Sequence, residues 1–213
     1  MSQDKKHFPG TGKLSRRSML RSSVASGTAV MVPLIATTSC TSLPASGTSP
    51  LSERENATLA SFADRIIPAD ELGPGASQCG VTDYINNTLV SWNSGDLPLI
   101  HEGLQALQTG ALQSYGRNFD ALSAGEQDFL IERMENSWLE GMRDSVQAFN
   151  RLYRLVLEGM FSDPWYGGNS NFAGWDLIGY PGAVMGSTAD MQVMGGRLPP
   201  LHTSAYGAEH DGD

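Results

Sequence analysis

Five stretches of the chain repeat apolar residues at the spacing of an α-helix, which favours a fold of helices packed on helices. The longest stripe runs in steps of four and three through Met142, Val146, Phe149, Tyr153, Val156 and Met160. No stretch of useful length alternates apolar and polar residues as a half-buried strand does. The sequence therefore predicts an all-α protein, with a small bundle of about five helices over residues 51–161.

Local signals predict where these helices begin and end. Ser52 with Glu55, and Ser123 with Glu126, have the spacing of capping boxes. Pro68 ends the first helix, and Pro98 lies in the first turn of the third. The residues expected to face the core in the first four helices are Leu59, Phe62, Ala63, Ile66, Ile67; Val81, Tyr84, Ile85, Thr88, Leu89, Trp92; Ile100, Leu104, Leu107, Ala111, Tyr115; and Phe129, Leu130, Met134.

The bundle is followed by a stretch rich in glycine and aromatic residues, Phe161–Gly182, with six aromatic rings and five glycines in twenty-two residues. Glycine disfavours a helix, so residues 162–182 are expected to form an irregular loop anchored by the rings. The loop either closes the core or docks a partner, and composition leaves both open. We expect Phe161 and Tyr166 to lie on the bundle, and Trp175 and Tyr180 to face a partner.

The last thirty-one residues, 183–213, lack a helical period and contain Pro199 and Pro200. They are expected to form an extended tail that is disordered alone and becomes ordered along a partner. At the other end, residues 41–50 have the composition of a Ser/Thr/Pro/Gly linker.

Residues 1–40 have the features of a twin-arginine export signal. Its motif consists of Ser15, Arg16, Arg17, Met19 and Leu20. A weakly apolar run of about 13 residues follows, whereas a membrane span needs about 20. The segment predicts recognition by the twin-arginine translocase and a periplasmic location.

Cys40 ends this segment, at the place where a lipoprotein signal carries its acylated cysteine. The preceding Thr37-Thr38-Ser39 matches a lipobox only in part. Cys40 is therefore either a lipid anchor or, after ordinary cleavage nearby, discarded or left free. An unmodified Cys40 could instead form a disulfide with Cys79 in an oxidising compartment. Cys79 itself is expected to be a small buried thiol.

The charge is divided unevenly between the leader and the body. Residues 41–213 contain eight arginines, no lysine and twenty-two acidic residues, a net charge of −14. This argues against nucleic acid and against basic patches on an anionic membrane as partners. We find no residue pattern for a catalytic group, a cofactor or a metal. His101 stands alone on a helix, and Asp64, Glu132, Glu135 and Glu140 are interpreted as solvated helix faces.

Three motifs in order resemble the gluconate 2-dehydrogenase subunit 3 family. They are Ile67-Pro68 through Pro74-Gly75-Ala76 to Gly80-Val81; Phe119 through Leu122-Ser123 to Glu126-Gln127; and the strings DPWYGGN, GW and GYPG within 163–182. The last is the most specific. The resemblance covers about residues 52–182 and the leader. The partial lipobox and Cys79 depart from the pattern.

The resemblance implies a non-catalytic small subunit that binds no cofactor itself. The implied partner is a flavoprotein of the glucose–methanol–choline type, which holds FAD and is exported with this chain. A multihaem cytochrome c with haem c is the implied third subunit, and the membrane is reached only through Cys40 or the complex. The expected partner-binding residues are Asp163, Pro164, Trp165, Tyr166, Gly167, Gly168, Asn169, Gly174, Trp175, Gly179, Tyr180, Pro181 and Gly182.

Two other functions remain open from the residues. The chain could be an enzyme in its own right, which would need a bound cofactor. It could also be a free-standing periplasmic lipoprotein with a structural role. The substrate of a partner dehydrogenase is not encoded in these patterns.

Overall fold

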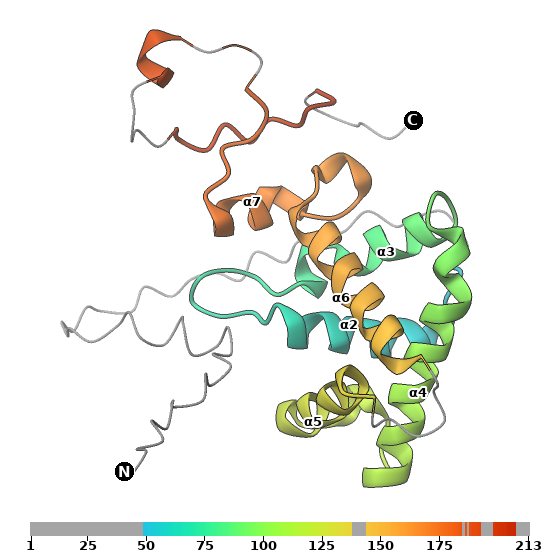
Figure 1. Cartoon of the computed structure of the whole chain (residues 1–213). Helices are drawn as coiled ribbons and strands as arrows, with labels where there is room; N and C mark the ends of the chain where they lie inside the picture. The colour runs from blue at the N-terminus through green and yellow to red at the C-terminus, as the bar shows by residue number, and fades with distance from the viewer. Residues whose placement is uncertain (1–48, 138–143, 185, 187, 193–197, 208–213) are drawn as a thin grey trace, which may run out of the picture. The chain divides into compact units, whose positions relative to one another are not determined.

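The part of the chain that the structure describes is helical, as expected (Figure 1). The structure is a computed structural model and describes residues 49–137, 144–184, 186, 188–192 and 198–207. Its α-helices are α2 (Glu53–Ile66), α3 (Val81–Leu89), α4 (Leu97–Tyr115), α5 (Ala124–Glu135), α6 (Ser145–Phe161) and α7 (Ala173–Ile178). Within these residues there is no β-strand, only an isolated bridge between Asp70 and Gly73. The predicted export signal, Cys40 and most of the linker lie outside the described residues.

Helices α2, α4 and α5 begin where local chemistry predicts. At the start of α2, Glu55 N–H donates to Ser52 Oγ, and Ser52 N–H donates to the Glu55 carboxylate at 2.9 Å. At the start of α5, Ser123 N–H donates to the Glu126 carboxylate at 2.8 Å. Both capping boxes are thus formed. Pro98 lies in the first turn of α4, as expected.

Helix α6 runs through the centre of the bundle and contacts each of the other described α-helices (Figure 1). Close approach is helped by Gly103 on α4, where an added Cβ would lie 3.0 Å from both Ala148 on α6 and Met134 on α5. The fully buried side chains of this core include Leu59, Phe62, Ile85, Ile100, Leu104, Leu107, Leu130, Met134, Leu152, Leu155, Val156 and Met160.

The helical stripe expected on α6 is only partly the buried one. Val146 is exposed and Tyr153 is half-buried, whereas Leu152 and Leu155 are fully buried. Ala148, which is also outside the predicted stripe, is buried as well. Met142, the first residue of that stripe, lies outside the described residues. Because α6 is packed against helices on several sides, its buried face is wider than a single stripe in steps of four and three.

Two other residues expected in the core are at the surface. Trp92 follows the end of α3 and is 60% exposed. Phe129 lies on the outer side of α5, is 48% exposed and has the Arg133 guanidinium 5.8 Å from its ring centroid. Trp92 comes after Leu89, the last residue of α3, so the helical period no longer places it. Phe129 lies between the buried Gln127 and Leu130 but on the side of α5 that is turned to solvent.

The connector between α2 and α3 is fastened by Asp64, which was expected to be solvated. Its carboxylate accepts hydrogen bonds from Ser77 N–H at 2.9 Å and from Ser77 Oγ at 2.6 Å. Glu132 and Glu135 are exposed, as expected, and Glu140 is outside the described residues. Cys79 is 1% exposed, which confirms that it is buried. None of the described helices is both long enough and apolar enough to cross a membrane.

Candidate functional site

The glycine–aromatic segment, residues 161–182, is folded onto the C-terminal end of α6. It was expected to be irregular throughout, yet it contains two short 3₁₀ turns, Pro164–Tyr166 and Ser170–Phe172, and the short helix α7. Gly179 ends α7 with a φ of 68°, in the left-handed region that glycine tolerates. The glycines therefore serve partly to end short helical turns, and they do not exclude them.

The backbone of the segment lies directly against the last turn of α6. A Cβ added to Gly168 would lie 2.1 Å from the Gly159 carbonyl oxygen, and one added to Gly174 would lie 1.8 Å from that of Met160. Asn169 is fully buried between them; its Nδ2 donates to the Ser162 carbonyl and its Oδ1 accepts from Gly174 N–H at 2.7 Å. The inner face of the segment is thus part of the protein core.

Trp175 belongs to this inner face, so the expectation that it faces a partner is wrong. It is 4% exposed, and its Nε1–H donates to the Phe161 carbonyl oxygen at 2.9 Å. Phe161 and Tyr166 are half-buried and pack on the core, as expected. Tyr180 is exposed, with its ring edge-on to Trp175. The glycines before Trp175 bring its backbone close to α6, and not to an outside surface.

The expected partner-binding residues therefore divide into three groups. Gly168, Asn169, Gly174, Trp175 and Gly182 are buried; Asp163, Pro164, Tyr166 and Pro181 are half-buried; and Trp165, Gly167, Gly179 and Tyr180 are exposed. In this structure the buried group serves the fold of the chain itself and is not accessible to another protein.

Residues 198–207, which we call the C-terminal strap, return to the glycine–aromatic segment. Leu201 N–H donates to the Pro181 carbonyl at 2.7 Å, and Ala183 N–H donates to the Thr203 carbonyl at 2.8 Å. His202 lies 2.7 Å from the Asp176 carboxylate. The prediction that the tail is disordered without a partner is therefore wrong for the strap, which already has specific contacts within the chain.

The centre of the strap is held by one carboxylate, that of Asp163. Asp163 accepts from Ser204 Oγ at 2.7 Å and from Ala205 N–H at 2.8 Å. It also accepts from Trp165 N–H, which caps the first 3₁₀ turn of the segment. A charged acceptor strengthens each of these bonds. Asp163 thus fixes the strap and the turn that carries Trp165 in one geometry.

Four aromatic rings meet beside this carboxylate, and we call Trp92, Trp165, Tyr166 and Tyr206 the aromatic platform. The ring centroids of Trp92 and Tyr166 are 5.6 Å apart, those of Tyr166 and Tyr206 are 5.7 Å apart, and those of Trp165 and Tyr206 are 5.4 Å apart. Trp92 is 60% exposed, Tyr206 54% and Trp165 42%. The rings come from the loop after α3, the glycine–aromatic segment and the strap.

Two rings of the platform are joined through their hydroxyl groups. The hydroxyl groups of Tyr166 and Tyr206 are 2.6 Å apart, and this hydrogen bond, with partial desolvation, raises the pKa of Tyr166.

The sequence did not predict two members of the platform. Trp92 was expected in the core, and no local pattern exists for Tyr206. The turn residues directly after Trp92, Asn93 to Asp96, were the one available sign that the helix had already ended.

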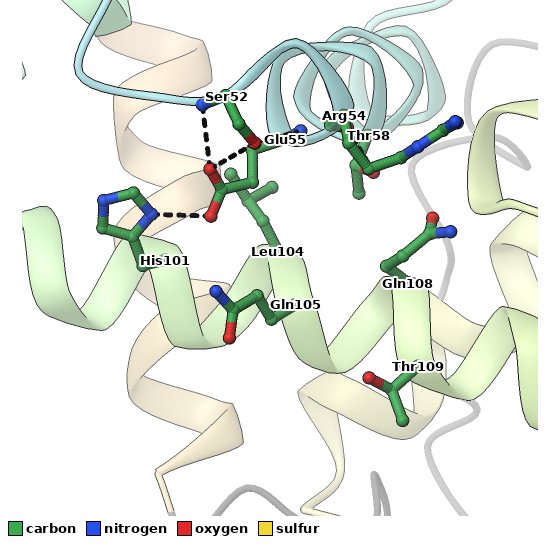
Figure 2. Close-up of a pocket in the computed structure, with 9 residues that line it drawn as sticks. All are labelled: Ser52, Arg54, Glu55, Thr58, His101, Leu104, Gln105, Gln108 and Thr109. Atoms are coloured by element: carbon green, nitrogen blue, oxygen red, sulfur yellow. Dashed lines mark hydrogen bonds and ion pairs between the residues drawn. The ribbon is translucent and has the colours of Figure 1, made fainter.

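A second candidate is a groove between α2 and α4, lined mainly by polar side chains (Figure 2). In Figure 2, His101 and Glu55 point toward one another, and His101 Nδ1 lies 2.6 Å from Glu55 Oε1. The other carboxylate oxygen accepts from Ser52 N–H and Ser52 Oγ. His101 is therefore paired and does not stand alone as expected. The full lining is Ser52, Arg54, Glu55, Thr58, His101, Leu104, Gln105, Gln108 and Thr109.

The hydrogen bonds of the Glu55 carboxylate in this groove connect α2 to α4. Burial disfavours the charged form of Glu55, but the hydrogen bonds from His101 and Ser52 outweigh it and hold the pKa of Glu55 below its ordinary value. Its oxygens are thus already bonded to α2 and α4. Within the described residues, no three His, Cys, Asp or Glu side chains are grouped to hold a metal ion.

Comparison with known proteins locates the family of the chain. The model of the family described as gluconate 2-dehydrogenase subunit 3 matches residues 53–182, more than half of the chain. No curated protein and no solved structure matches. The matched region begins with the first residue of α2 and ends with the glycine–aromatic segment, so it includes the bundle and excludes the leader and the strap. The chain belongs to the gluconate 2-dehydrogenase subunit 3 family.

Proposed function

We propose that this chain is the non-catalytic small subunit of a flavin-dependent, gluconate 2-dehydrogenase-like complex in the periplasm. The observation that carries the proposal is the family match over residues 53–182. The predicted twin-arginine motif at Ser15–Leu20, upstream of the matched region, supports it. The family implies a multi-subunit dehydrogenase. In this complex the catalytic FAD lies in a large subunit of the glucose–methanol–choline type, and haem c lies in a multihaem cytochrome c subunit.

The proposed task of this chain is to bring the large subunit across the membrane and to stay bound to it. The twin-arginine route exports folded proteins, so the large subunit takes up FAD in the cytoplasm and travels with the leader of its partner. Exposed Trp and Tyr side chains, the residue types that dominate protein interfaces, support a binding role. Acylation of Cys40 would add a membrane anchor to the exported complex.

The proposal is tested by inactivating the predicted export signal and measuring in which compartment the large subunit accumulates. Arg16→Lys with Arg17→Lys should leave both this chain and the flavin-containing large subunit in the cytoplasm, with FAD still bound. Arg21→Lys, a charge-preserving change at the end of the same cluster that keeps the arginine pair, should export both normally. Immunoblots and flavin content of periplasmic and cytoplasmic fractions supply the measurement. A large subunit that reaches the periplasm undiminished in the double variant would refute co-export.

A further inference from the structure

We infer that the aromatic platform is the surface on which the large flavoprotein subunit docks, and that the C-terminal strap completes this surface by supplying Tyr206. The inference rests on the proposed function and names the binding surface within it. It adds Trp92 and Tyr206 to the site. Tyr206 lies beyond residue 182, where the family match ends. The inference also removes Trp175 from the expected partner-binding residues, because Trp175 is buried.

The exposure of the platform rings is the first argument. Trp92, Trp165 and Tyr206 are 60%, 42% and 54% exposed although they lie in one connected group of rings. Large aromatic side chains bury roughly 150–250 Å² each, so together these three expose on the order of 300 Å². The largest apolar patch of a soluble monomer usually measures about 300–600 Å² and is often functional, so the platform is in the range of such a patch. Clustered Trp and Tyr residues are the usual centre of a protein interface.

The platform is held rigidly, which favours binding. Asp163 fixes the strap through Ser204 and Ala205, and the Tyr166 and Tyr206 hydroxyls are joined at 2.6 Å. On its other side, Tyr166 packs against the core. Rings that are already ordered lose little conformational freedom on binding. The strap thus makes an ordered docking surface out of segments that are far apart in sequence.

A stable complex needs more surface than the platform rings expose. A standard interface buries about 800 Å² on each partner, so the platform rings would form its centre but not its whole extent. The glycine–aromatic segment and the residues directly after it expose further apolar side chains, those of Leu177, Ile178, Tyr180 and Val184.

Charge distinguishes the large subunit from a second copy of this chain. Residues 41–213 have a net charge of −14, so two copies meeting through one face would repel each other. The complementary surface should be apolar at its centre and carry Arg or Lys at its rim. The same charge disfavours contact with an anionic membrane. The observations therefore fit a different protein with a basic rim.

The test measures binding to the flavin-containing large subunit that co-purifies with the wild-type chain. We expect Trp92→Ala and Tyr206→Ala to raise the Kd by about 30-fold or more, which corresponds to the ~2 kcal/mol typical of interface hot spots. Phe129→Ala is the matched control, because Phe129 is a similarly exposed ring (48%) on α5, at the opposite end of α6 from α7 (Figure 1). It should change the Kd less than twofold. Thermal melting of each free variant confirms that it is folded.

Each outcome decides one question. Folded Trp92→Ala and Tyr206→Ala variants that bind the large subunit as tightly as wild type overturn the docking surface but leave the proposed function intact. A wild-type chain that binds no flavoprotein refutes the proposed function itself. Dimers in sedimentation that Tyr206→Ala abolishes would assign the platform to a second copy, and binding to phosphatidylglycerol vesicles that Trp92→Ala abolishes would assign it to lipid. Either result overturns the inference.

Discussion

The indole Nε1–H of Trp175 donates a hydrogen bond to the carbonyl oxygen of Phe161, the last residue of α6, at 2.9 Å. The carbonyls of the last turn of a helix have no partner within the helix and need one elsewhere. Trp175 supplies that partner from fourteen residues further along the chain, while its ring fills the space beneath α7. This contact makes the glycine–aromatic segment a part of the fold and not an appendage to it.

Truncation of Trp175 should therefore destabilise the fold much more than truncation of Trp165. Trp175→Ala is expected to lower the free energy of unfolding by about 3–5 kcal/mol, because it leaves a cavity and an unpaired carbonyl. Trp165→Ala removes a ring that is 42% exposed and stacked on Tyr206, so it should lower the stability by only about 1 kcal/mol. Urea denaturation of the two variants measures both values. Equal losses would show that the assignment of inner and outer faces is wrong.

Gly174 tests the contact between the segment and α6 without changing an aromatic ring. Gly174→Ala places a Cβ 1.8 Å from the Met160 carbonyl oxygen, and the backbones must move apart, so we expect a loss of about 3 kcal/mol or more. Gly125→Ala is its control, since nothing lies within 4 Å of an added Cβ there. It should be neutral or stabilise α5 by up to about 1 kcal/mol. A Gly174→Ala variant that melts like wild type would contradict the backbone contact.

Glu55 should make the stability depend on pH in the acid range. Its pKa is held below the ordinary value of 4.5, so the unfolded state binds the proton more tightly than the folded state. The stabilisation is therefore fully present above pH 4.5 and is lost as the pH falls through the lowered pKa. At neutral pH we expect Glu55→Gln to lower the free energy of unfolding by about 1–2 kcal/mol.

The measurement for Glu55 is a series of urea unfolding curves from about pH 7 down to about pH 3. The difference between wild type and Glu55→Gln should shrink across the lower part of this range. Glu53→Gln is the control, because Glu53 is an exposed acid in the same first turn of α2. If the difference in free energy of unfolding between wild type and Glu55→Gln stays constant down to about pH 3, the proposed link between α2 and His101 is wrong.

Much of the helical body was predictable because its signals are local. The capping boxes at Ser52 and Ser123 act over three residues, and Pro98 acts on its own turn, so neither depends on the rest of the fold. The buried Cys79 and the exposed Glu132 also follow from side-chain chemistry. Periodicity placed the helices correctly but was less accurate for their faces, as Val146 and Phe129 show.

The amino-acid sequence by itself determined the fold class, the capped starts of α2 and α5 and the motifs of the family. The tertiary structure decided which aromatic rings are buried and which are exposed. Trp175 and Trp92 are the same residue type, yet Trp175 is buried and Trp92 is exposed. The neighbouring Gly174 brings the backbone of Trp175 into contact with the last turn of α6, and Trp92 has no such neighbour. Tyr206 meets Tyr166 across forty residues of chain. Such pairings depend on where distant segments are placed, and no local period or cap records that placement.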